Sequence, residues 1–100
     1  MLHIVNKSPG ERSALESCLA HARAGHSVLL IEDAVYAATK GHAAAARLRE
    51  AIGRSVAVFV LAPDLEARAR AGAVLEGVTS VDYRGFVDLV TGNPRVQSWL

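Results

Sequence analysis

Four short apolar runs, each the length of a β-strand, alternate with segments of helical spacing along this chain. They cover residues 2–5, 27–31, 56–61 and 78–81. The second run is continuously apolar rather than alternating, which is typical of strands covered on both faces of a parallel sheet. Strands that alternate with helices favour a doubly wound arrangement with right-handed crossovers. We therefore predict an α/β fold with an open, mostly parallel sheet of four to five strands, the fifth coming from residues 96–100.

The helices are expected from capping residues and from apolar spacing. Ser8, Pro9 and Glu11 fit a capping box that opens a first helix, which runs to about Ala24 and stops at Gly25. The other expected helical segments are residues 34–39, residues 42–52 ending at Gly53, residues 65–71 capped by Asp64 and ended by Gly72, and a helix from Asp82 or Tyr83 to Val90 ended by Gly92-Asn93-Pro94.

The length of 100 residues predicts a single domain over residues 1–100. So few short helices leave part of a five-stranded sheet uncovered, and exposed apolar surface usually marks an interface. Oligomerisation is therefore expected. The apolar end Trp99-Leu100 points the same way, because chain ends normally fray in water. We expect both residues to be held against the core or against another subunit, and they are our interface candidates.

Charge and cysteine content exclude several classes of protein. The formal net charge of +1 provides no electrostatic footprint for binding nucleic acid alone. A single cysteine, Cys18, cannot form an internal disulfide. No apolar run approaches the roughly 20 residues that span a bilayer, and His3, Asn6 and Lys7 interrupt the first run, which argues against a signal peptide. A soluble, cytoplasmic protein without membrane contact is expected.

Ligands of open α/β sheets bind beyond the carboxyl ends of the strands. No Gly-rich phosphate loop lies there, which disfavours dinucleotide and NTP binding. Ser8 is either a nucleophile or a helix cap, and the cap is favoured. Glu32 and Asp33 could bind a metal ion or serve as an acid and a base. The favoured interpretation is that Asp33 caps a helix and that Glu32 is solvated. Asp82 with Tyr83 is similarly interpreted as a cap.

Cys18 is the only sulfur nucleophile in the chain. It lies in the third turn of the expected helix, too far for the helix dipole to stabilise a thiolate. His21 is the only local group that could assist it, whereas Leu15 and Leu19 surround it on the apolar stripe. A buried thiol acting as a small hydrophobe is the favoured interpretation. The four histidines form no metal motif, so we predict no metal, no cofactor and no self-contained enzyme.

The chain resembles the DsrH/TusB family over essentially its whole length. The resemblance is carried by the order and spacing of several segments and is strongest in the terminal Ser-Trp-Leu. One departure is Ala34, where relatives commonly have Gly after Glu-Asp. The matching segments are Met-Leu-His-Ile-Val-Asn-Lys-Ser-Pro at the start, Leu-Glu-Ser-Cys-Leu at 15–19, Leu-Ile-Glu-Asp-Ala-Val-Tyr-Ala-Ala at 30–38, Val-Asp-Tyr-Arg-Gly-Phe-Val-Asp-Leu at 81–89 and Val-Gln-Ser-Trp-Leu at 96–100.

The resemblance implies a DsrE/F/H-like, flavodoxin-like fold and a place in a cytoplasmic sulfur-relay complex. Family members join DsrE/TusD-like and DsrF/TusC-like subunits in a hexamer with two copies of each. The complex passes persulfide sulfur to a downstream acceptor, either for 2-thiolation of the tRNA wobble uridine or for dissimilatory sulfur oxidation. The main relay cysteine belongs to the DsrE/TusD-like partner, and DsrH-type members carry a cysteine at the position of Cys18.

Three functions follow as hypotheses. The first is an assembly subunit without catalysis of its own, which does not bind tRNA directly by itself. The second is a direct persulfide carrier through Cys18. The third is a stand-alone binding domain for a small ligand, with a pocket lined by Asn6, Asp33 and Asp82.

Overall fold

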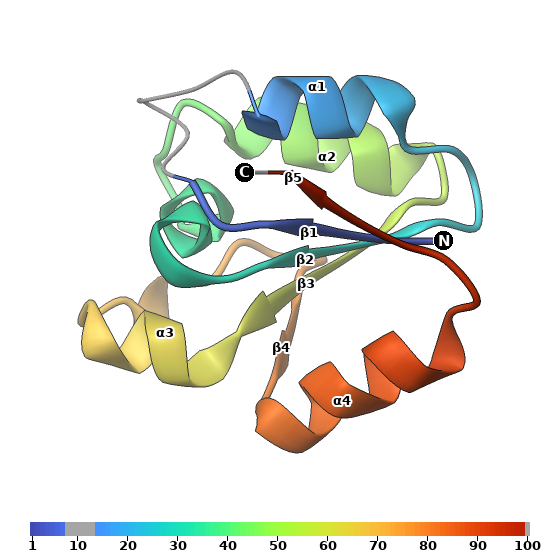
Figure 1. Ribbon diagram of the computed structural model, residues 1–100. Helices are drawn as coiled ribbons and strands as arrows, with labels where there is room; N and C mark the ends of the chain where they lie inside the picture. The colour runs from blue at the N-terminus through green and yellow to red at the C-terminus, as the bar shows by residue number, and fades with distance from the viewer. Residues whose placement is uncertain (8–13, 100) are drawn as a thin grey trace.

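The structure, a computed structural model, describes residues 1–7 and 14–99. A five-stranded parallel sheet with strand order β4-β3-β2-β1-β5 forms its centre (Figure 1). The strands are β1 (Leu2–Val5), β2 (Ser27–Leu30), β3 (Ala57–Leu61), β4 (Thr79–Val81) and β5 (Val96–Trp99). The predicted α/β fold is confirmed. Flavodoxin has the strand order 2-1-3-4-5, so the likeness to it lies in the layers rather than in the order of the strands.

The path of the chain brings its two ends together. From β1 the strands advance across the sheet in one direction to β4, and the chain then returns so that β5 lies on the free side of β1. Leu2 therefore pairs with Val96, and Val5 pairs with Trp99. Both edges of the sheet come from the last quarter of the chain, because β4 and β5 are the outer strands.

The helices divide unequally between the two faces of the sheet. One face carries α1 (Ala14–His21), the 3-10 helix η1 (Glu32–Ala38) and α2 (Ala45–Gly53), and this side holds the main apolar core. On the other side of the sheet lies α4 (Tyr83–Gly92), which has no buried residue (Figure 1). Two shorter elements, α3 (Ala62–Ala67) and η2 (Ala71–Ala73), connect β3 to β4. The second face of the sheet is thus only thinly covered.

The helix that follows β3 differs from the prediction. It covers Ala62–Ala67 with Leu61 at its N-cap position, so Asp64 lies inside the helix and does not cap it. The helix ends in a Schellman motif, in which Arg70 N–H donates to Leu65 O at 2.9 Å and Ala69 has φ of 56°. Gly72, the predicted terminator, lies in η2 instead.

Three other helical segments also differ from the prediction. The first helix ends at His21 rather than Ala24, and there Arg54, the C-cap residue of α2, donates to the carbonyl groups of Leu19 and Ala22. The segment after β2 is a 3-10 helix with Ile31 at its N-cap position, so Asp33 lies inside it and the predicted Asp33 cap is wrong. The helix predicted over 42–52 begins only at Ala45. The predicted capping box of Ser8, Pro9 and Glu11 lies outside the described residues.

The start of α4 follows the prediction. Asp82 caps it, with Gly85 N–H donating to Asp82 Oδ1 at 2.8 Å. Gly85 also permits the close approach of α4 to β4, because a Cβ atom at this position would lie 2.8 Å from Val81 Cβ. In the part of the chain that the structure describes, no helix combines the length and the apolar character needed to cross a membrane.

Candidate functional site

Cys18 lies in the core and not at a reactive surface. Its exposed fraction is 0%, and burial raises the pKa of the thiol to about 12. The neutral thiol therefore predominates near pH 7, whereas the thiolate is the nucleophile. His21 offers no local activation, since its Nδ1–H donates to Ser17 O at 2.8 Å and its ring lies 5.3 Å from the Trp99 ring, centroid to centroid. In this conformation Cys18 behaves as a small hydrophobe.

Trp99 joins a chain of hydrogen bonds with two histidines. An indole N–H can only donate, so Trp99 Nε1–H donates to His3 Nδ1 at 3.1 Å and leaves the proton of neutral His3 on Nε2. His3 Nε2–H then donates to His26 Nδ1 at 3.1 Å, and Arg23 N–H donates to the same nitrogen, also at 3.1 Å. We call His3, His21, His26 and Trp99 the histidine–tryptophan cluster. It joins β1 and β5 to the ends of α1 and β2.

The environment of the cluster favours neutral imidazole rings. His3 has an exposed fraction of only 2%, and burial lowers its pKa below 6.5, with further lowering by His26, the chain amino terminus and His21. The pKa of His26 is lowered as well, first by desolvation and then by the positive charges of the amino terminus and Arg23. Neutral rings are also what the hydrogen bonds require, because both Nδ1 atoms accept.

The acidic residues at the strand ends serve the structure. Asp33 Oδ1 accepts a hydrogen bond from Arg68 Nε at 3.0 Å and forms an ion pair with Arg68 Nη2 at 2.9 Å. Asp64 Oδ2 accepts from Glu32 N–H at 2.6 Å, and Asp82 caps α4. Glu32 is exposed, as expected.

The third hypothesis needs Asn6 and Asp82 in one pocket, and the structure does not bring them together. They follow β1 and β4, which lie three strands apart in the sheet, a separation of about 14 Å at the usual strand spacing. Asn6 Oδ1 is buried and has no hydrogen-bond partner among residues 1–7 and 14–99. Within the same residues, no group of three or more His, Cys, Asp or Glu side chains is placed to hold a metal ion.

Of the two interface candidates, Trp99 is half-buried and packs against the apolar core, while Leu100 lies outside the described residues.

Sequence reasoning missed the histidine–tryptophan cluster. The only available signal was that His3 interrupts an otherwise apolar strand. Its partner Trp99 is 96 positions away, beyond the reach of any local pattern.

Comparison with known proteins agrees with the fold and identifies the family. A family model described as "DsrH like protein" matches residues 7–96. The chain is 36% identical to Protein TusB of Erwinia tasmaniensis and 32% identical to Protein TusB of Pectobacterium parmentieri, in each case over 99% of this chain and 100% of the relative. Protein TusB of Escherichia coli K12 is 33% identical over the same shares.

Two solved structures share the fold at low sequence identity. The crystal structure of the ychN protein from E. coli has a TM-score of 0.82 at 17% identity and covers 97% of both chains. MTH1491 from Methanobacterium thermoautotrophicum, a protein of unknown function, has a TM-score of 0.72 at 19% identity and covers 97% of this chain and 95% of its own. The family match over residues 7–96 and the identities of 32–36% to the three TusB proteins establish that this chain belongs to the DsrH/TusB family.

Proposed function

We propose that this chain is a non-catalytic assembly subunit of a cytoplasmic sulfur-relay complex. It joins DsrE/TusD-like and DsrF/TusC-like subunits in a hexamer with two copies of each, and the DsrE/TusD-like partner supplies the main relay cysteine. The complex passes persulfide sulfur to an acceptor protein on the way to 2-thiolation of the tRNA wobble uridine. Family membership supports the pathway, and exposed apolar residues on α4 and on β5 support the assembly role.

Those exposed apolar residues are the observation on which the proposal chiefly depends. The three exposed large hydrophobic residues among those described are Tyr83, Val87 and Val96, with exposed fractions of 62%, 56% and 43%. Tyr83 and Val87 are four positions apart and share one face of α4. Val96 lies on β5, an edge strand whose outer backbone groups can pair with another chain. Exposed apolar side chains and a free sheet edge each favour a protein partner over solvent.

The buried thiol supports the accessory role. A relay nucleophile must meet a partner's persulfide, whereas Cys18 is fully enclosed and its pKa is about 12. Catalysis by the partners removes the need for a reactive group on this chain.

Co-expression with both partner types and measurement of the assembled mass by light scattering tests the proposal. The wild-type chain should enter a complex with both partners. Val87→Asp should weaken assembly at least tenfold, because it buries a charge at the contact, while Ala46→Asp on the exposed face of α2 should assemble normally. A wild-type chain that binds neither partner at micromolar concentration would refute the assembly role.

The alternative is that Cys18 itself carries persulfide sulfur, and it is favoured by the match of Cys18 to the cysteine position of DsrH-type members. Labelled sulfur followed through a complex containing Cys18→Ser separates the two roles. The assembly role predicts unchanged transfer, and loss of transfer with intact assembly would establish the carrier role. Alkylation of Cys18 should be slow in the native chain and fast after unfolding.

The choice between tRNA thiolation and sulfur oxidation rests on relatives. The name TusB carried by the relatives supports thiolation, while Cys18 is the feature shared with the oxidation branch. Removal of the gene should abolish tRNA 2-thiouridine. Normal 2-thiouridine together with impaired sulfur oxidation would assign the chain to the other branch. In gel-shift assays the isolated chain should not bind tRNA.

A further inference from the structure

A cavity of about 330 Å³ between α1 and α2 is lined by the ion pairs of Arg47 with Glu16 and of Arg54 with Glu50. A second cavity of about 310 Å³ is lined by cations without carboxylates among the described residues. Its lining includes Tyr36, Lys40, His42 and Arg70, contributed by η1, the turn after it and the segment after α3. We call it the Lys40–Arg70 pocket. Its volume is in the range of small-ligand sites.

The charge of this pocket has one sign. Lys40 and Arg70 are cationic at neutral pH, and no carboxylate occurs among the described residues that line it. Arg47, Arg54 and Arg68 each pair with a carboxylate elsewhere. Across residues 14–99, by contrast, neither Lys40 nor Arg70 forms such an ion pair. A concave surface with two uncompensated cations concentrates anions.

The polar groups of the lining are arranged as donors. His42 Nδ1 accepts from Ala44 N–H at 3.0 Å, so the ring keeps its proton on Nε2, where it can donate. The Arg70 guanidinium carbon lies 5.8 Å from the centroid of the Tyr36 ring, an arrangement that orients the guanidinium group by a cation–π contact. Lysine and arginine have no acceptor atoms. Their ligand must therefore supply acceptors and negative charge.

The two sides of the pocket are held together by the backbone. Lys40 N–H donates to Ala73 O at 2.7 Å, and Leu75 N–H donates to Ala38 O at 2.7 Å. Thr39 and Val74 form an antiparallel bridge between these two bonds. Lys40 and Arg70 consequently lie on two segments joined before any ligand arrives, which lowers the ordering cost of binding.

From this donor set we propose that the Lys40–Arg70 pocket binds a tetrahedral oxyanion, namely a phosphate group, either as the free ion or at the end of a small phosphorylated metabolite such as a nucleoside monophosphate. Arg70 is suited to bidentate contact with two oxygens, and Lys40 provides a point charge. The proposal is independent of complex assembly, since the pocket is formed by this chain alone.

Titration of the full-length, isotope-labelled chain with inorganic phosphate, followed by NMR at constant ionic strength, tests the proposal. Saturable shifts should appear at the amides of residues 36–42 and 70–73. Arg70→Gln should weaken binding about tenfold or more, and Lys40→Gln should weaken it as well. Arg49→Gln, which removes an exposed charge from α2, should leave it unchanged.

The source of the phosphate is distinguished by parallel titrations with uridine 5′-monophosphate and with uridine. Tighter binding of the nucleotide than of inorganic phosphate would assign the site to phosphorylated metabolites, and equal affinities would assign it to the free ion. Saturable binding of uridine, an absence of saturable shifts with either phosphate ligand, or equal weakening by Arg49→Gln and Arg70→Gln would overturn the proposal.

Discussion

Trp99 and His3, 96 positions apart in the chain, are joined by a hydrogen bond of 3.1 Å from the indole Nε1–H to the imidazole Nδ1. The bond connects the last described strand to the first, and it lies at the start of the hydrogen bonds that continue to His26. His3 has an exposed fraction of 2%, so water does not readily replace the indole as a partner. The C-terminal strand is thereby tied to the interior.

Replacement of Trp99 by Phe should destabilise the protein. The change keeps an aromatic ring but leaves the buried Nδ1 of His3 without its donor, which costs about 1–3 kcal/mol in the free energy of unfolding. Urea denaturation measures the loss. Gln97→Ala, at an exposed position on the same strand, should change the free energy by less than about 0.5 kcal/mol. Equal effects of the two variants would contradict a specific role for the indole.

Stability should fall on acidification through the titration of His3. Its folded-state pKa lies below the ordinary value of 6.5, so between these two values the unfolded chain binds more protons than the folded one. The stabilisation is complete above pH 6.5 and is lost as the pH falls through the lowered folded-state pKa. Protonation of Nδ1 would also break the bond from Trp99.

Urea midpoints measured from pH 7.5 down to pH 5, about one to two units either side of the ordinary histidine pKa, should show this slope. The variant His3→Gln should have a shallower slope, whereas Gln97→Ala should keep the wild-type slope. A wild-type slope retained by His3→Gln would assign the pH dependence to other groups.

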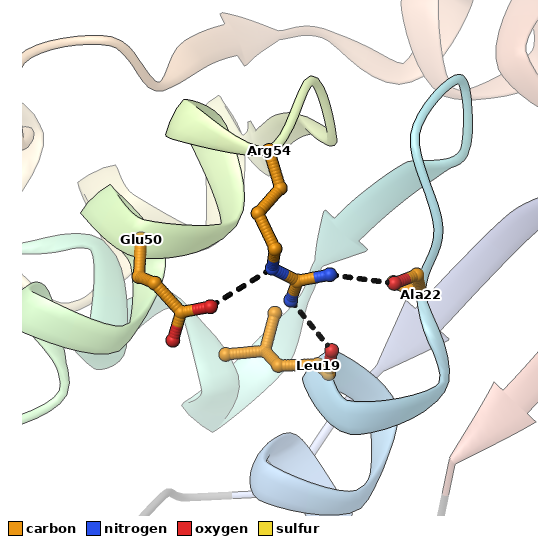
Figure 2. Close-up of polar contacts among 4 residues, drawn as sticks. All are labelled: Leu19, Ala22, Glu50 and Arg54. Carbon is orange, nitrogen blue, oxygen red and sulfur yellow. Dashed lines mark hydrogen bonds and ion pairs between the residues drawn. The ribbon is translucent and has the colours of Figure 1, made fainter.

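Arg54 should be important for the junction of α1 and α2. Its guanidinium donates to Ala22 O and Leu19 O, each at 2.9 Å, and pairs with Glu50 at 2.9 Å (Figure 2). The Arg54 guanidinium thus provides hydrogen-bond donors for carbonyl groups at the end of α1. Arg54→Lys keeps the charge but cannot make these three contacts together, and we expect a loss of about 1–2 kcal/mol in urea denaturation.

The control for this substitution is Arg49→Lys on the same helix, where the side chain is exposed. Its effect should stay within about 0.5 kcal/mol. If Arg54→Lys is equally neutral, the carbonyl contacts do not contribute to stability.

Glycine at position 69 should stabilise the protein. Ala69 has φ of 56° at the end of α3, and an L-residue with a Cβ atom is disfavoured there by roughly 1 kcal/mol. Ala69→Gly should therefore raise the thermal midpoint. Ala46→Gly, inside the exposed part of α2, should lower it through a helix-propensity cost of about 1 kcal/mol. A lower thermal midpoint in both variants would show that the entropy cost of ordering a glycine outweighs the removal of backbone strain at position 69.

Local features of the sequence determined the elements of the fold. Apolar runs of strand length predicted the first four strands, and the continuous run of β2 fits a strand buried on both faces, which needs apolar side chains at every position. The fifth strand was predicted from residues 96–100, where apolar and polar side chains are mixed. Asp82 was correctly predicted as a cap, since capping depends only on residues within one turn. The apolar neighbours of Cys18 in the sequence likewise indicated its burial. Helix ends were less predictable, as α1 shows, because a residue from another helix decides where its carbonyl groups find partners.

Only the tertiary structure decided what these elements bring together. The return of the chain across the whole sheet places β5 beside β1, and this connection, not any pattern near either end, joins Trp99 to His3. The same holds for Arg54, which acts on carbonyl groups 32 and 35 positions away, and for Lys40 and Arg70 on two joined segments. Periodicity and capping depend on neighbours within a few residues, whereas side-chain clusters depend on strand order and crossover, which the local sequence does not encode.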